Sequence, residues 1–364
     1  MQHSVLILAP DTDPHACALA WALEQQGIHA AWTPSLQAKP GFHYAFHIDA
    51  DRENFFDATT RHTPISAAWN RRLHDPQPTC AEADEAFAGL EWKLFQRNLF
   101  GLANSYHDAL WINPLPAAQR AENKLAQLSA CRRLGLPFPE TVVTTHVDEV
   151  DTLRKKWGRI IFKSFMIHQW EDDETGKKHA VGVTLLDERS DLPADAIAVC
   201  PGIYQRYIDK SCDIRVTVMG QHLFALCLRK ASSGGFVDWR PHSGDPELVA
   251  EAITLPAFME NKLRALMHDL GLVFGCIDLV VDRHGDYHFL EVNQAGQFLF
   301  VEDMLPAYPM LQAMTAMLAS GRQDFRIDGL KAVSMKAFRA SDAYAQLKER
   351  AGKLTPDRQL FTLE

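Results

Sequence analysis

Two carboxylates and an amide occur in neighbouring apolar segments of the sequence, where they could bind a metal ion together. Residues 275–281 (GCIDLVV) contain Asp278, and residues 288–293 (HFLEVN) contain Glu291 and Asn293. The length and apolar composition of the two segments predict a pair of buried strands joined by a tight turn. Because side chains alternate between the two faces of a strand, Glu291 and Asn293 share one face.

The register of this predicted hairpin decides whether the three groups meet. A turn centred on His284 and Gly285 places Asp278 directly opposite Glu291. A shift of two residues would instead set Asp278 against Asn293 and still leave the three groups on one face. Opposed side chains have Cβ atoms roughly 4.5–5.5 Å apart, and like charges at that distance destabilise a sheet. We therefore expect a positive charge between the two carboxylates.

A divalent cation is one source of that charge. Carboxylate and amide oxygens are hard ligands, and Mg²⁺ is often held by one or two carboxylates together with the phosphates of a substrate. The alternative is that one carboxylate pairs with an arginine while the other faces water. On the metal interpretation, replacing Asp278 or Glu291 by alanine should remove activity but largely retain the fold, because the relief of their repulsion offsets the lost metal.

Two lysines and three arginines could neutralise the phosphates of a nucleotide beside such a site. Lys163 interrupts the apolar run at residues 159–165, and Lys124 begins a segment with helical spacing. Taken singly, Lys124 is typical of a surface lysine, and Lys163 could equally extend from an edge strand into water. A planar guanidinium can hold two phosphate oxygens, although surface ion pairing explains each arginine taken alone. The three arginines are Arg215, Arg229 and Arg240.

The segments that must position these groups alternate between strand-like and helix-like patterns. Residues 4–9 are a short apolar run, and residues 16–26 have helical spacing that ends at Gly27. The intervening residues 10–14 carry no glycine-rich phosphate-binding fingerprint, so a dinucleotide-binding domain is not indicated. We expect an α/β amino-terminal domain that ends near Pro114.

The remainder of the chain predicts mixed helices and strands. Strands at residues 213–219 and 222–228 flank a tight turn at Gly220-Gln221. The charged stretch 171–179 is expected at the exposed tip of a hairpin, either as a mobile lid or as a solvated turn. The expected divisions are an amino-terminal domain at 1–114, a central subdomain at 115–195, a carboxy-terminal subdomain with the acidic hairpin at 196–330, and a helical extension of unassigned role at 331–364.

Composition and charge exclude several classes of function. The chain has 364 residues with 47% apolar positions, enough to bury the cores of two or three domains. The net charge of −9 provides no basic field for a nucleic acid. Seven scattered cysteines without a C-x-x-C pair, and no apolar run of signal-peptide or membrane-spanning length, complete the pattern. We expect a cytoplasmic protein without a nucleic-acid or membrane partner.

The order of these motifs resembles the ATP-grasp superfamily, from about residue 113 to residue 325. The motifs that carry the resemblance are Asn123-Lys124, Phe162-Lys163, Gln205-Arg206-Tyr207-Ile208, Asp213-Ile214-Arg215, Asp238-Trp239-Arg240, Asp278 and Glu291-Val292-Asn293. Within that superfamily the chain is similar to the microviridin-type peptide macrocyclases, the graspetide synthetases. The motifs that indicate this branch include Trp69-Asn70-Arg71-Arg72, Trp111-Ile112-Asn113, Leu136-Pro137-Phe138-Pro139-Glu140-Thr141, Asp238-Trp239-Arg240, the residues from Glu291 to Phe298, and Gly321-Arg322-Gln323-Asp324-Phe325.

This resemblance implies an ATP-grasp fold, in which two α+β subdomains clasp ATP behind an α/β amino-terminal domain. ATP and two Mg²⁺ ions are the implied cofactors. The residues implied to contact the nucleotide are Lys124 and Lys163 at the phosphates, Gln205, Arg206 and Tyr207 at the adenine hinge, Asp213 at the ribose, and Arg240. The arginines implied to hold the γ-phosphoryl group and the acyl phosphate are Arg215, Arg229 and Arg240. The implied metal ligands are Asp278, Glu291 and Asn293.

Members of this family turn side-chain carboxylates of a ribosomal precursor peptide into lactones with Ser or Thr, or into lactams with Lys. The resemblance therefore implies an ADP-forming ligase whose partner is a precursor peptide. An intermolecular ligase that adds a residue, and a catalytically silent peptide-binding protein, remain as alternatives. Gln294 and Phe298 replace a proline and a tryptophan expected near the metal strand, and the tail after Gly329 is longer than usual. The peptide, the ester or amide product, the number of rings and a homodimer are left open.

Overall fold

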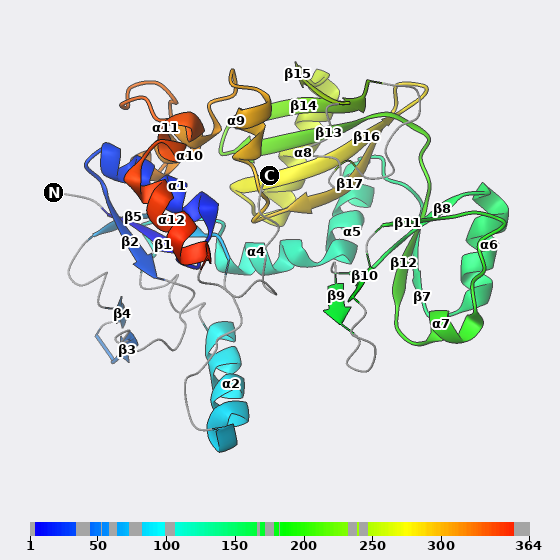
Figure 1. The fold of residues 1–364 in the computed structure, drawn as a ribbon, viewed down its shortest axis with the longest axis horizontal. Helices are drawn as coiled ribbons and strands as arrows, with labels where there is room; N and C mark the ends of the chain where they lie inside the picture. The colour runs from blue at the N-terminus through cyan, green and yellow to red at the C-terminus, as the bar shows by residue number, and fades with distance from the viewer. Residues whose placement is uncertain are drawn as a thin grey trace.

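The computed structural model describes residues 4–33, 44–51, 53–57, 64–72, 82–98, 106–165, 168–171, 178–181, 183–231, 239 and 247–352. Three sheet-containing regions lie in a row in Figure 1, with a five-stranded sheet between an amino-terminal sheet and a smaller four-stranded sheet. Helix α4 (Leu115–Glu122) runs along this row, and α5 (Lys124–Leu134) turns upward from its end beside β17 (Figure 1). The mixed α/β class expected from the sequence is therefore confirmed.

The amino-terminal region is a parallel sheet in the order β2-β1-β5-β6. Its first strand is buried throughout, as its apolar composition requires. Asp13 caps the helix that follows, because its Oδ1 accepts the backbone N–H of Ala16 at 2.9 Å. The elements are β1 (Ser4–Leu8), α1 (Pro14–Gln25), β2 (His29–Thr33), β5 (Ile65–Asn70) and β6 (Leu110–Ile112), with β3 (Tyr44–Ile48), β4 (Glu53–Asp57) and α2 (Glu82–Arg97) as additions.

The five-stranded sheet is antiparallel throughout, in the order β15-β14-β13-β16-β17. One face packs on α5 and α8 (Ala257–Leu270), where Leu263 and Leu266 are fully buried. Part of the other face joins the core of the amino-terminal region through α9 (Phe300–Met304) and α10 (Met310–Ser320). The strands are β13 (Lys210–Met219), β14 (His222–Lys230), β15 (Leu248–Ile253), β16 (Phe274–Asp282) and β17 (Tyr287–Asn293).

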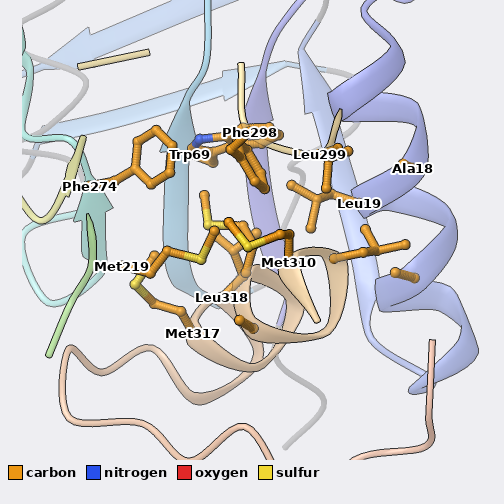
Figure 2. Close-up of a cluster of buried hydrophobic side chains, with 14 of the residues drawn as sticks. Ala18, Leu19, Trp69, Met219, Phe274, Phe298, Leu299, Met310, Met317 and Leu318 are labelled. Carbon is orange, nitrogen blue, oxygen red and sulfur yellow. The ribbon is translucent and has the colours of Figure 1, made fainter. Parts of the chain in front are cut away.

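Figure 2 shows how this shared core is built. Phe274 and Met219 from the five-stranded sheet approach Trp69 of β5 and Phe298, the latter from the segment after β17. The ring centroids of Phe274 and Phe298 are 5.2 Å apart with their planes inclined at 66°, the edge-to-face arrangement that aromatic pairs favour. The amino-terminal region and the five-stranded sheet therefore pack as one body around a common apolar centre.

The central region has a separate, smaller core. Its sheet has the order β11-β8-β12-β7 and packs on α6 through buried residues such as Val150 and Leu153. The elements are β7 (Thr141–Thr144), α6 (Val147–Trp157), β8 (Ile160–Lys163), β11 (Thr184–Leu186), α7 (Ala194–Ala198) and β12 (Gly202–Arg206). Strands β9 (His168–Glu171) and β10 (Lys178–Val181) pair as the hairpin expected near 171–179, whose tip lies outside the described residues.

Two expected subdomain divisions do not coincide with the observed sheets. Strand β12 pairs with β7 and β8, so the central sheet continues to Arg206, beyond the expected boundary at 195. Helices α4 and α5 contact α8 and β17 of the five-stranded sheet, although the expected central subdomain begins at residue 115. Strand pairing determines the first point and helix packing the second, and sequence spacing alone reveals neither.

The carboxy-terminal extension is helical as expected, with α11 (Met335–Arg339) and α12 (Asp342–Gly352). Phe338 is fully buried and lies 5.7 Å from the ring of Trp21 on α1. Glu302 of α9 accepts hydrogen bonds from the backbone N–H groups of Leu311 at 2.9 Å and Met335 at 2.7 Å. The extension is thus attached to the amino-terminal region. A search of the described residues for a helix with the length and apolarity to cross a bilayer finds none.

Candidate active site

The acidic hairpin has the predicted pairing at its carboxylates. Asp278 of β16 lies directly opposite Glu291 of β17, and Asn293 lies opposite Cys276 on the same face. Nearer the turn, Leu279 pairs with Phe289, so Leu290 is the extra residue of a β-bulge. The register between the bulge and the turn is therefore one residue different from the prediction, and the bulge restores it where the carboxylates meet.

Each carboxylate of the hairpin is paired with a separate cationic side chain of the protein, and at Asp278 this is an arginine, as the alternative interpretation expected. Arg215, the partner of Asp278 on β13, donates from Nη1 to Asp278 Oδ1 at 2.8 Å. Lys124, at the start of α5, donates from Nζ to Glu291 Oε2 at 2.6 Å. The first pair is buried, with both side chains 6% exposed, whereas the Lys124 and Glu291 side chains are 30% and 16% exposed. Asp278 is therefore the buried carboxylate of the site, and Glu291 is the more exposed one.

The buried pair changes the expectation for a substitution at Asp278. The prediction that an alanine there leaves the fold largely intact depended on repulsion between the two carboxylates. Because Arg215 is buried beside Asp278, removing the carboxylate would leave a charged guanidinium without its ionic partner in the interior. Replacing Asp278 by alanine is therefore expected to lower the stability of the fold, whereas replacing Glu291 is not.

The more exposed residues of the hairpin, Glu291 and Asn293, carry oxygen ligands that suit Mg²⁺. Glu291 is half-buried, and Asn293 Nδ2 lies 3.4 Å from Glu291 Oε1, so the carboxylate and the amide are adjacent. Within the described ranges, no group of three or more His, Cys, Asp and Glu side chains could hold a metal ion. The predicted set has two carboxylates and one amide, which matches an ion that takes its remaining ligands from phosphate oxygens and water.

Two contacts from outside the sheet, from Gln127 and Pro137, fix strand β17. Neither residue was assigned a role in the site from the sequence. Buried Gln127 of α5 donates from Nε2 to the carbonyl of Val292 at 2.9 Å and accepts the N–H of Val292 at 2.9 Å. The carbonyl of Pro137 accepts the N–H of Phe289 at 2.7 Å. A polar residue at a core-facing position of the helical segment that begins at Lys124 was the signal that could have identified Gln127.

Asn113 joins both strands of the hairpin to the end of the amino-terminal sheet. Its side chain is buried, and Oδ1 accepts the N–H groups of Val273 at 2.8 Å and Phe274 at 2.9 Å. Its Nδ2 donates to the carbonyls of Phe274 at 2.9 Å and Gln294 at 2.8 Å. The Trp111-Ile112-Asn113 motif therefore has a structural reason, because one amide connects the start of β16 to the residue after β17.

The predicted nucleotide residues of the central region share one face of its sheet. Lys163 donates from Nζ to Gln205 Oε1 at 3.0 Å, and Gln205 Nε2 donates to Thr141 Oγ1 at 2.9 Å. These residues come from the neighbouring strands β8, β12 and β7. The structure thus brings Lys163 and Gln205 together and orients the amide of Gln205 through Thr141.

The predicted adenine hinge has its side chains stacked within the protein. The guanidinium of Arg206 lies 3.9 Å from the centroid of the Trp157 ring, and Arg159 lies 4.5 Å from the ring of Tyr207. The N–H of Arg206 donates to the carbonyl of Glu140 at 2.8 Å, which ties the hinge to the linker before β7. Contact of Arg206 and Tyr207 with adenine remains a prediction.

Asp213, the predicted ribose contact, is paired with a lysine that the sequence analysis did not select. Lys210 donates from Nζ to Asp213 Oδ1 at 2.7 Å, and both residues are buried at the start of β13. The signal available in the sequence for this pair was a lysine three residues before an acidic residue, just ahead of a predicted strand. Asp213 also lies on the same face of β13 as Arg215. Its carboxylate is therefore on the face of the sheet that carries Asp278 and Glu291.

Arg229 is not brought to the site. Arg215 pairs with Leu226, so alternation along β14 places Arg229 on the opposite face of the sheet. There it forms an exposed ion pair with Glu251 of β15. The predicted role of Arg229 at the phosphoryl group is therefore not supported. Arg240 and Asp238 lie outside the described residues, whereas Trp239 between them is buried against Phe300, with ring centroids 5.6 Å apart.

Solved structures share this architecture over nearly the whole chain. A RiPP-associated ATP-grasp ligase from Chryseobacterium gregarium, in complex with ADP and a leader and core peptide, has a TM-score of 0.77 at 20% identity, with 91% of this chain and 100% of that chain covered. The macrocyclase MdnC from Microcystis aeruginosa, bound with its precursor peptide MdnA, has a TM-score of 0.72 at 21% identity, with 88% and 100% covered. The macrocyclase MdnB from the same organism has a TM-score of 0.68 at 25% identity, with 87% and 99% covered.

These likenesses define the class of fold. The chain has the ATP-grasp fold, as the order of its motifs predicted. Within that class its architecture is similar to that of the RiPP-associated ligase and of the macrocyclases MdnC and MdnB over 87–91% of this chain. No protein-family model matches the sequence, and a search of curated proteins finds no match. The resemblance was therefore carried by a few short motifs, and the fold confirms it.

Proposed function

We propose that this chain is an ATP-dependent, ADP-forming ligase that activates a side-chain carboxylate of a ribosomal precursor peptide and joins it to a hydroxyl or amine of the same peptide. One observation carries the proposal. Lys124, Glu291, Asp278 and Arg215 form a continuous charged row across α5, β17, β16 and β13, in which a cation flanks each of the two facing carboxylates. That row occurs in a chain which covers the full length of structures solved with ADP and precursor peptides.

The chemistry explains why such a row is needed. A carboxylate is a poor electrophile, and ATP with Mg²⁺, when bound, supplies a phosphoryl group that converts it into an acyl phosphate with a good leaving group. Attack of one anion on another requires positive charge around the transferring group. The expected metal ligands are Asp278, whose side chain is buried, and the more exposed Glu291 and Asn293.

The cationic residues have distinct positions in this scheme. Lys163 of the central sheet and Lys124 at the start of α5 are expected to contact the nucleotide phosphates. Arg215 is the expected contact of the γ-phosphoryl group and the acyl phosphate, because its guanidinium is held by Asp278 and by the carbonyl of Gln297 at 2.8 Å. A guanidinium held at two points loses little freedom when it binds an anion, which favours transition-state stabilisation over ground-state binding.

Mass spectrometry of the precursor peptide tests the proposal. The purified enzyme, its precursor peptide, ATP and Mg²⁺ should yield a product lighter by one water molecule for each bond formed, with one ADP released per bond. A Glu291→Gln enzyme serves as the control, since it keeps the shape of the side chain but removes its charge. An unchanged peptide mass with the wild-type enzyme would refute ring closure.

The same measurement separates the two alternatives. A peptide that gains the mass of a residue would identify an intermolecular ligase. Binding of the peptide without any release of phosphate would identify a catalytically silent binding protein. Cytoplasmic location and a homodimer are further parts of the proposal, and light scattering of the purified protein at several concentrations tests the dimer.

A further inference from the structure

The segment that follows the metal strand lies between the amino-terminal region and Arg215. We call residues 294–299 the post-hairpin segment. The carbonyl of Gln297 accepts a hydrogen bond from Arg215 Nη2 at 2.8 Å, while Arg215 Nη1 binds Asp278. Gly296 allows this close approach, because a Cβ there would lie 2.6 Å from the Cβ of Cys276. The position of the guanidinium therefore depends on the position of this segment.

The amino-terminal region grips the other side of the post-hairpin segment. His15 Nε2 accepts the backbone N–H groups of Phe298 at 3.1 Å and Leu299 at 3.4 Å. Arg71 Nη1 donates to the carbonyl of Ala295. Both side chains are almost completely buried, and Arg71 Nε also lies 3.4 Å from Asp13 Oδ2. Two buried polar residues of the amino-terminal region, His15 and Arg71, thus hold the backbone of the post-hairpin segment, and Asp13 pairs with Arg71.

The protonation states of this cluster suit the contacts. Burial, together with the nearby positive charge of Arg71, lowers the pKa of His15 to about 3, so its Nε2 remains an acceptor at neutral pH. Burial alone would raise the pKa of Asp13, but Arg71 and His15 hold it below its usual range. Asp13 is therefore an anion beside the Arg71 guanidinium and at the same time the cap of α1.

We propose that His15 and Arg71 are positioning residues for Arg215. They hold the post-hairpin segment so that the carbonyl of Gln297 fixes one arm of the guanidinium while Asp278 fixes the other. The amino-terminal region contributes no side chain to the charged row formed by Lys124, Glu291, Asp278 and Arg215, yet it determines where the phosphoryl-contacting arginine lies. This inference rests on the proposed function, because it is the ligase reaction that gives Arg215 a purpose.

Kinetics of three variants test the positioning role. Arg71→Met should lower kcat about 10- to 100-fold and change KM for ATP by less than about threefold, because small displacements of a catalytic group cost that much. Arg71→Lys, which keeps a charged donor, should recover part of the rate. Leu23→Ala is the matched control, since Leu23 is fully buried on α1 and its apolar side chain makes none of the hydrogen bonds that hold the segment. It should lower Tm and leave kcat of the folded enzyme unchanged.

A double-mutant cycle separates positioning from general destabilisation. If Arg71 acts through Arg215, the Arg71→Met change should cost little further activity in an Arg215→Met enzyme, because the contact it supports is already gone. Additive losses, or an equal loss of kcat in Leu23→Ala, would overturn the inference.

Hydrogen exchange tests the same contacts without any need for catalysis. In His15→Phe, which keeps an aromatic ring but has no acceptor, the amides of Phe298 and Leu299 should exchange at least about tenfold faster, whereas Leu23→Ala should not change them relative to its own global stability. Unchanged exchange in His15→Phe would refute the grip even if the protein proved to have no ligase activity. Faster exchange with no detectable ligase activity would instead count against the proposed function alone.

Discussion

The five-stranded sheet and the central sheet hold their site residues in different ways. In the five-stranded sheet, the groups around Glu291 are fixed by segments far away in the sequence, including α5 and the end of the amino-terminal sheet. In the central sheet, Lys163 contacts Gln205 and Gln205 contacts Thr141, all on adjacent strands. The side expected to perform phosphoryl transfer is therefore preorganised by the whole molecule, and the side expected to hold the nucleotide is built locally.

The largest expected effects separate the two carboxylates of the hairpin. Asp278→Ala should abolish detectable ligation and lower the free energy of unfolding by about 3–5 kcal/mol, because it breaks a buried ion pair with Arg215 by removing one side. Glu291→Ala should abolish ligation equally but change stability by about 1 kcal/mol or less, because its pair with Lys124 is more exposed. Urea unfolding and phosphate release measure the two properties, and equal stability losses would contradict the difference in burial.

A substitution in the central sheet should act on nucleotide binding. Lys163→Met is expected to raise KM for ATP about 10-fold or more with a smaller change in kcat, because its Nζ lies beside Gln205 on the sheet expected to hold the nucleotide. Lys156→Met is the control, since Lys156 lies on α6 beside Glu140 and is 55% exposed. Steady-state kinetics with varied ATP tests this, and a pure loss of kcat in Lys163→Met would place the lysine on the transfer side instead.

Loosening the metal strand should give an intermediate effect. Gln127→Leu leaves the N–H and C=O groups of Val292 without the amide that now binds them, which should cost about 1–3 kcal/mol of stability. We also expect the concentration of Mg²⁺ needed for half-maximal activity to rise, because Val292 lies between Glu291 and Asn293. Titration of activity with Mg²⁺ measures this shift. An unchanged Mg²⁺ requirement would show that the strand holds its ligands without Gln127.

The smallest effect is expected at Arg229. Arg229→Gln should leave kcat and KM within about twofold of the wild-type values, since the side chain lies on the far face with Glu251. Arg215→Gln is the matched comparison and should lower kcat about 10²- to 10³-fold, as expected for the loss of a donor to the transferring group. A comparable loss in both enzymes would mean that the face assignment of Arg229 is wrong.

The pairing of Asp278 with Glu291 could be predicted because alternation along two short strands fixes which residues face each other. The position of Arg229 was also available in principle. A tight turn at Gly220-Gln221 pairs Met219 with His222, and alternation then sets Arg229 on the face away from Arg215. The error came from treating arginines near strand ends as convergent without following that register.

Other features depend on tertiary packing and could not be read from spacing. The sheet order that places β13 beside β16 makes Arg215 the partner of Asp278, and no local pattern specifies that order. The contacts of His15 and Arg71 with the post-hairpin segment join residues more than 200 positions apart. The fold class was predictable because short motifs in a fixed order carried it, whereas the buried network that positions the site was not.

The occupied border of β17 restricts how a peptide can reach the reacting groups. Peptides often attach to proteins as an added strand, through backbone groups along the rim of a sheet. At β17 the N–H of Phe289 is already bound to Pro137, and both backbone groups of Val292 are bound to Gln127. Strand addition beside the metal ligands would have to displace these bonds. A substrate loop is therefore expected to enter over the open face, with its acidic side chain extended inward, so that the length of that side chain limits which residues can be joined.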